Sequence, residues 1–319
     1  MKFRTEVHFN EVAEKIQTED RIFSIGSCFS TEMSTLLKRG QLQTLNNPFG
    51  TIFNPYSVNT ALRRIHSSSF YTEEDLIAYQ DRFISLDHHS GFNSEYVHKT
   101  LEKINLNIEK SNLFLQSANW VMITYGSSFI YEFLPKNKLV ANCHKIPDKF
   151  FSKRLLTPGE IRNSVRETIS FLKDICPEGV QLLFTVSPVR HTKDGMMENQ
   201  RSKSLLISNL HDVLEETENC TYLPVYEMMM DDLRDYRFYK EDMIHPTQQA
   251  VNYIFEKFGN AYFSDETMDF IEENFKIMKA LEHRTSDDQS PKHHEFLENL
   301  KGRIALQQTK VKHKIFTES

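Results

Sequence analysis

The sequence contains no apolar run long enough to cross a lipid bilayer, which takes about 20 residues in a helix. Its first residues also turn polar too early to form the apolar stretch of a secretory signal peptide. These two absences predict a cytoplasmic protein that has no membrane partner.

The sequence also lacks an excess of basic residues. It has 38 lysines and arginines against 44 aspartates and glutamates, which gives a formal net charge of −6 over 319 residues. Proteins that bind nucleic acid need a positive field to neutralise phosphates. We therefore expect no nucleic-acid partner.

Cysteine is scarce. The four cysteines, Cys28, Cys143, Cys176 and Cys220, are widely scattered, and no two have the spacing of a zinc knuckle or a redox motif. We expect reduced thiols and no disulfide framework.

Four histidines fall in expected loops, and with Asp87 or Asp194 they could be drawn as a metal site. They are His88, His89, His144 and His191. Their spacings match no metal motif, so we expect neither a metal nor a cofactor. We expect His89 and His144 instead to line a polar cleft and contact the sugar or acyl groups of a substrate.

Short apolar runs alternate with helical patterns in a chain that is 39% hydrophobic and 26% charged. This alternation predicts an α/β fold with a parallel sheet covered by helices on both faces. The expected strands are 21–25, 120–125, 180–186 and about 221–223. The expected helices are 30–38, one starting at Pro158, about 203–215, and one starting at Pro246.

We expect residues 1–262 to form one domain, with an insertion at about 56–117 whose 71–81 part is helical. Residues 263–319 read as a C-terminal helical extension with an apolar stripe of Met268, Ile271, Phe275 and Met278. The stripe could dock on the body, cover the cleft or pair with a second copy, so a homo-oligomer is one of the open alternatives.

Ser27 follows the first expected strand, which Gly26 closes, and precedes a helix. Parallel α/β folds place their chemistry in such turns. A serine hydroxyl needs a nearby base and donors for the oxyanion that forms when it attacks. Asp242 and His245 are three residues apart, so one turn can present a carboxylate to the imidazole. We predict Ser27 as nucleophile, His245 as base and Asp242 as the group that orients His245.

Two neighbouring features stay open. Cys28 could be the nucleophile, although a cysteine that begins a helix is more often a packing residue. Arg190 follows the strand 180–186, so it either reaches the cleft to bind an anionic or hydroxyl-rich substrate or braces the loop against an acid near Asp231. Gly50 and Gly126 lie beside strand ends, where a backbone N–H of one could join that of Ser27 in binding an oxyanion.

Gly26-Ser27-Cys28-Phe29-Ser30 resembles the signature of the GSCFA family, a branch of the SGNH (GDSL-like) hydrolase superfamily, with serine in place of the final alanine. Further stretches resemble the family in the same order along the chain: 47–51, 142–145, 187–191, 231–239 and 242–246.

The resemblance implies a three-layer α/β/α flavodoxin-like fold, with a serine after the first strand and an Asp-x-x-His pair before the last helix. Ser27, Asp242 and His245 match these positions. It also implies an oxyanion hole made by the serine N–H, a glycine N–H and an asparagine after the third strand. Gly50 matches the glycine.

The expected asparagine is missing, because this chain reads Gly126-Ser127-Ser128 after the strand 120–125. Asn142 is our candidate replacement and Ser127 the second.

These observations predict a cofactor-independent serine esterase that cleaves an O-acyl ester through an acyl-enzyme on Ser27. The superfamily suggests a small-molecule or carbohydrate ester, such as an O-acetyl group. One alternative is acyl transfer to an alcohol by the same three residues. Another is a catalytically weak protein that keeps the fold as a binding or scaffold module.

Overall fold

The computed structural model describes residues 5–9, 12–282 and 291–317. The first four residues, which contribute to the expected cytoplasmic location, lie outside these ranges. Within the described ranges, no helix combines the length and the apolar character needed to cross a membrane.

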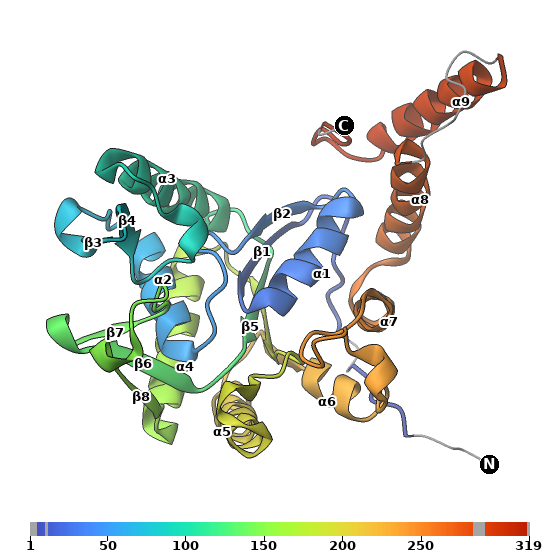
Figure 1. Ribbon diagram of the computed structural model, residues 1–319. Helices are drawn as coiled ribbons and strands as arrows, with labels where there is room; N and C mark the ends of the chain where they lie inside the picture. Colours follow the sequence, from blue (N-terminus) through green and yellow to red (C-terminus); the bar gives the residue numbers. More distant parts are fainter. Residues whose placement is uncertain (1–4, 10–11, 283–290, 318–319) are drawn as a thin grey trace.

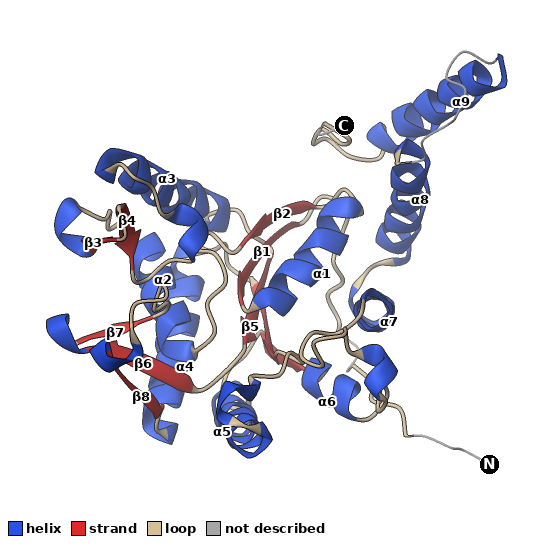
Figure 2. Cartoon of the chain, in the orientation of Figure 1, coloured by secondary structure: helices blue, strands red, loops and turns tan. Residues whose placement is uncertain are grey.

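A five-stranded parallel sheet forms the centre of the molecule (Figures 1 and 2). Its strands, in chain order, are β1 (Arg21–Gly26), β2 (Gln43–Asn46), β5 (Trp120–Tyr125), β9 (Gln181–Val186) and β10 (Cys220–Leu223). They lie side by side as β10-β9-β5-β1-β2. Counted along the chain, this is the 2-1-3-4-5 order of flavodoxin-like folds. The predicted fold class is confirmed, and the strand order reverses between β1 and β5.

Helices cover both faces of the sheet, with α2 and α4 on one side and α1 and α7 on the other (Figure 1). Successive strand residues point to opposite faces, so Ile123 packs in the core beside α2 and α4, and Met122 in the core beside α1 and α7. The helices of the domain are α1 (Cys28–Arg39), α2 (Pro55–His66), α3 (Val97–Leu115), α4 (Pro158–Ile175), α5 (Met196–Leu214), α6 (Val225–Met230) and α7 (Gln248–Tyr262).

Two expected helix starts have different outcomes. The helix predicted at Pro158 is confirmed, and Thr157 with Glu160 forms its capping box. The helix predicted at Pro246 begins two residues later, at Gln248. Thr247 is its cap, because the Thr247 side chain accepts the N–H of Ala250. Pro246 is held outside the helix by a bridge to Tyr239.

The prediction of a helix at 71–81 is wrong. Most of this segment belongs to a hairpin of β3 (Leu76–Tyr79) and β4 (Arg82–Ser85). Gln80 and Asp81 make the connection with φ of 48° and 58°, the backbone of a tight hairpin turn. The acidic residues before Leu76 form only a single short turn.

A second small sheet was not predicted. It is antiparallel, with strand order β7-β6-β8, and lies in the chain between β5 and α4. Its strands are β6 (Phe129–Phe133), β7 (Lys138–Val140) and β8 (Phe151–Leu155). Leu86 packs with Phe133 and Val140 in a separate apolar cluster, which joins this sheet to the β3–β4 hairpin.

The C-terminal extension forms α8 (Asp265–Leu281) and α9 (Pro291–Gln308) and docks on the body (Figure 1). Asn274 Nδ2 donates to the Gly40 carbonyl just after α1, and Glu282 pairs with Arg39. α1 has 12 residues and therefore spans about 18 Å, with Ser27 at its other end. These contacts of the extension lie far from Ser27.

The buried residues of α8 differ from the predicted stripe. Ile271 is buried as expected, but the other buried residues of the helix lie outside the predicted stripe: Thr267, Phe270, Asn274 and Ile277. Phe275 and Met268 are partly buried beside it.

Gly26, the last residue of β1, lies unusually close to β5. Its φ is +138°, and a β-carbon there would stand 2.1 Å from the Thr124 carbonyl oxygen. Both the backbone angle and the contact therefore require glycine. The close approach fixes where the chain turns into α1.

Replacing Gly26 with alanine should lower the free energy of unfolding by at least about 2 kcal/mol, because it adds backbone strain and a clash with a carbonyl. Gly159→Ala is the matched control, since nothing lies within 4 Å of its added β-carbon. That control should be neutral or stabilising by up to about 1 kcal/mol. Urea unfolding of both variants measures the difference in the free energy of unfolding. Equal values for the two variants would contradict the claim that position 26 requires glycine.

Candidate active site

Ser27 caps the start of α1 in an extended conformation, with φ −70° and ψ 174°. Its N–H donates to the Thr124 carbonyl at 2.9 Å and so continues the β1–β5 pairing. The side chain is fully buried, and its hydroxyl has no hydrogen-bond partner among the described residues. The hydroxyl is therefore uncommitted, at the point where the strand order of the sheet reverses.

Asn47 holds this turn from the side. Its Oδ1 accepts the Gly26 N–H at 2.7 Å, and its Nδ2 donates to Thr31 Oγ1 at 2.9 Å. The amide thereby links the end of β1 to the first turns of α1. Sequence reasoning missed this role, although Asn47 begins one of the family-like stretches.

Asp242 and His245 form a close pair. Asp242 Oδ2 lies 2.7 Å from His245 Nδ1, and Asp242 Oδ1 accepts the N–H groups of His245 and Ile244 at 2.9 and 2.8 Å. The hydrogen bonds from His245 are the main cause that lowers the pKa of Asp242. Asp242 therefore stays ionised and holds the imidazole with Nε2 on the opposite side of the ring.

Arg190 braces the loop that carries this pair. Its N–H donates to the Ile244 carbonyl at 3.2 Å and its guanidinium to the Met243 carbonyl at 3.4 Å. The guanidinium also stacks 3.7 Å from the centre of the Tyr239 ring. The brace is thus to backbone and aromatic groups rather than to an acid near Asp231. A contact between Arg190 and substrate stays a prediction.

Three side chains converge at Gly126, the residue that follows β5. A β-carbon there would stand 2.9 Å from Phe53 Cδ1, 3.1 Å from His191 Nε2 and 3.3 Å from Ser27 Cβ. A β-carbon at this position would crowd the Phe53 ring, so the glycine leaves the room that these side chains occupy. His191 and Ser27 therefore lie around one point beside the end of β5. We did not single out His191 for this position, although it lies in the family-like stretch 187–191.

Lys203 is a fully buried lysine beneath this junction. Its Nζ donates to the Gly126 carbonyl at 2.7 Å and to the Ser187 carbonyl at 2.6 Å, and so joins the ends of β5 and β9. Burial lowers its pKa to about 7. Sequence reasoning missed this residue, because a lysine inside a helical pattern is normally exposed.

The donor groups of Gly50 and Ser127 already have hydrogen-bond partners, whereas the contact of Asn142 engages only its side-chain oxygen. The Gly50 N–H donates to the Asn47 carbonyl, and the Ser127 hydroxyl is bonded to Ser202 and accepts the Phe129 N–H. Asn142 Oδ1 accepts the His144 N–H at 2.9 Å. Their role in an oxyanion hole stays a prediction.

The two histidines expected to contact substrate differ in exposure. His89 is exposed, and its N–H bonds to the Phe49 carbonyl, next to Gly50. His144 is buried, with Nε2 2.8 Å from the Ser85 carbonyl and Nδ1 3.1 Å from Asn93 Nδ2. Both ring nitrogens of His144 thus contact protein groups, and substrate binding by either histidine stays a prediction.

The thiol of Cys28 is a weak candidate nucleophile. Burial raises its pKa, which disfavours the reactive thiolate. All four cysteines of the chain are free in the structure. Within the described residues, no three His, Cys, Asp or Glu side chains gather as a metal site.

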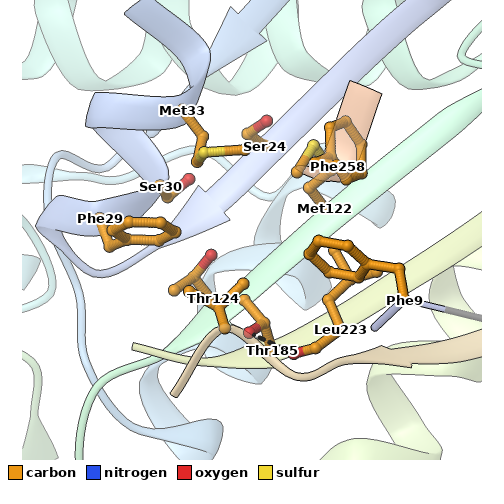
Figure 3. A pocket seen from close by; sticks show the side chains of 11 residues that line it. Phe9, Ser24, Phe29, Ser30, Met33, Met122, Thr124, Thr185, Leu223 and Phe258 are labelled. Carbon is orange, nitrogen blue, oxygen red and sulfur yellow. Dashed lines mark hydrogen bonds between the residues drawn. The ribbon is translucent and has the colours of Figure 1, made fainter. Parts of the chain in front are cut away.

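A cavity of about 10 Å³ lies on the α1 side of the sheet, with Ser30, Met33 and Thr124 in its wall (Figure 3). Phe258 of α7 and Phe9 close other sides of it. This volume is enough for about one water molecule and far too small for an ester substrate.

Comparison with protein families matches residues 21–258 to the GSCFA family. No curated protein matches the chain. Similar solved structures include a DUF4886 family protein from Bacteroides uniformis, with a TM-score of 0.39 and 11% identity over 94% of this chain and 99% of that chain. A catalytic mutant of an acetylxylan esterase from Geobacillus stearothermophilus has a TM-score of 0.41 and 9% identity, over 78% and 97%. A GDSL-like lipase from Bacteroides thetaiotaomicron has a TM-score of 0.39 and 11% identity, over 78% and 91%.

Buried histidines should make the fold sensitive to acid. Burial lowers the pKa of His88, His144 and His191, the last to about 3. Below about pH 6.5 the unfolded chain binds protons that these folded residues do not, so the free energy of unfolding falls as the pH falls. For His88, the free energy of unfolding should therefore be lower at pH 5 than at pH 7.

His88→Asn removes the titrating ring, so it should reduce the loss of stability between the two pH values. Phe49→Leu is the control, because it removes the ring that stacks on His88, with 4.2 Å between the ring centroids, but leaves the histidine in place. Urea unfolding at pH 7 and pH 5 compares the three proteins. If the free energy of unfolding depends on pH in His88→Asn as it does in wild type, His88 is not a source of the acid sensitivity.

Proposed function

The chain belongs to the GSCFA family, and from this premise we propose that it is a serine hydrolase that cleaves an O-acyl ester through an acyl-enzyme on Ser27. The observation that carries the proposal is the short Asp242–His245 contact on a loop braced to the end of β9. An imidazole held in this way at Nδ1 can accept a proton at Nε2.

An indirect chain of contacts supports a place for this base near Ser27. Arg190 bonds to Ile244, and the next residue, His191, reaches Gly126 beside Ser27. The Ser27 hydroxyl is unpaired in the described structure. Catalytic hydrogen bonds often tighten only when substrate is bound, so we expect the contact between Ser27 and His245 to form in the complex.

In the proposed reaction, Ser27 Oγ attacks the acyl carbon while its proton passes to His245 Nε2. The tetrahedral intermediate collapses, the C–O bond to the alcohol breaks, and the alcohol leaves with that proton. Water then attacks the acyl-enzyme, giving up a proton to His245, which returns it to Ser27 as the acid leaves. Asp242 keeps the imidazole oriented and stabilises its charged form throughout.

The surroundings of the hydroxyl favour a short acyl group. Ser27 is fully buried, and Phe53 and His191 pack around Gly126 beside it. A small acyl group such as acetyl needs the least rearrangement there. An acetyl ester of a carbohydrate or another small alcohol is therefore our proposed substrate class.

Hydrolysis of p-nitrophenyl acetate tests the proposal, with the octanoate ester as a comparison for acyl length. Ser27→Ala and His245→Ala should each lower kcat by about 10⁴-fold or to background, because removal of a nucleophile or base leaves only the remaining stabilisation. The acetate ester should be hydrolysed faster than the octanoate ester.

Cys28→Ala is the control, because it changes the adjacent residue and should keep its activity. Equal rates of ester hydrolysis in wild type and all three variants would contradict the enzyme proposal. Loss of activity in Cys28→Ala alone would move the nucleophile to Cys28.

A further inference from the structure

The backbone donors beside Ser27 already have acceptors. The Ser27 N–H bonds to the Thr124 carbonyl, and the N–H groups of Gly126 and Ser127 both bond to the Phe53 carbonyl at 2.7 and 3.1 Å. An oxyanion on a Ser27 adduct needs a preorganised donor of its own. A side chain is therefore the simplest source.

His191 has an uncommitted polar atom in the required place. Its Nε2 is buried and has no partner among the described residues, and it lies against the same point of Gly126 as Ser27 Cβ. The Ser27 hydroxyl is the other buried and unpaired polar group at this point. Both unpaired groups lie beside the same point of Gly126, and a polar ligand placed there would give each of them a partner.

The main chain and the ring of His191 each contact one neighbour. The backbone N–H of His191 donates to Asn199 Oδ1 at 2.8 Å, and Asn199 is itself buried on α5, so the main chain that carries the ring is held in place. The ring packs edge-on against Phe53, with 5.3 Å between centroids. A donor held in this way needs little reorganisation during a reaction.

The ring is also neutral. Burial lowers the pKa of His191 to about 3, and the charges of Lys203, His245 and Lys153 add to this effect, while Asp194 opposes it. A neutral imidazole carries one hydrogen and can polarise a carbonyl without giving up a proton.

We propose that His191 Nε2 donates the hydrogen bond that stabilises the oxyanion on the Ser27 adduct, the role expected of the missing asparagine. This inference rests on the proposed hydrolase function. As the bond from Ser27 Oγ to the acyl carbon forms, the carbonyl electron pair moves onto oxygen, which accepts the Nε2–H. The pair returns when the bond to the alcohol breaks, and His191 keeps its hydrogen throughout.

Steady-state hydrolysis of p-nitrophenyl acetate by His191→Leu and His191→Gln tests the proposal. The leucine variant has no donor, so kcat should fall about 100- to 1000-fold with KM changed by less than about threefold. The glutamine variant places an amide N–H at a similar reach and should stay within about tenfold of wild type. Its pH dependence of kcat/KM should keep the wild-type midpoint, because the base is a different histidine.

His66→Leu is the control for loss of a histidine, because His66 pairs with Asp174 at the end of α2 that is remote from Phe53. It should stay within about twofold of wild type. Circular dichroism and thermal unfolding check that each variant folds. If His191→Leu does not fold, His191→Met takes its place as the variant without a donor.

Wild-type kcat in a folded leucine or methionine variant would overturn the donor role while leaving Ser27-dependent hydrolysis intact. If kcat falls as far in His191→Gln as in His245→Ala, and the pH profile also changes, His191 acts as the base. That result would also overturn the donor role. If wild type is no faster than Ser27→Ala, the hydrolase proposal fails and this inference fails with it.

Discussion

The contact between the ends of β1 and β5 is the constraint on which the rest of the site depends. Gly26 approaches the Thr124 carbonyl more closely than any other residue would allow, and Gly126 leaves room where three side chains meet. Because the strand order reverses between these two strands, their following loops diverge. The fully buried Ser27 hydroxyl lies at this point of reversal.

Buried and braced groups extend this constraint to the other loops. Lys203 joins the carbonyls of Gly126 and Ser187, so the ends of β5 and β9 are held at a fixed separation. Arg190 then fixes the loop of Asp242 and His245 to the residues after β9. The proposed base is therefore positioned through the sheet rather than by its own helix, which begins only at Gln248.

Much of the fold was predictable because the central strands are buried on both faces and read as continuous apolar runs. The segment 120–125 is an example, with every residue of β5 buried. By contrast, the residues of β2 are only partly buried and all but Leu45 are polar, so they give no such signal. The hairpin at 76–85 depends on left-handed backbone at Gln80 and Asp81, and neither residue requires that conformation.

The candidate site was predictable only in part. The GSCFA-like stretches predicted the family correctly, and the Asp242–His245 spacing predicted a contact that the structure contains. The roles of His191 and Lys203 depend on contacts between β5, β9 and α5. No spacing within one segment reports such contacts. A sequence cannot say which of two consecutive residues, Arg190 or His191, lies beside Ser27.

The central claim is that the turn after β1 presents Ser27 as a nucleophile, and covalent labelling measures this most directly. The folded protein would be treated with a fluorophosphonate, digested and analysed by peptide mass spectrometry. We predict one adduct, on Ser27, that forms in Cys28→Ala and is lost in His245→Ala. An adduct on Cys28, or no adduct above that of the denatured protein, would contradict the claim.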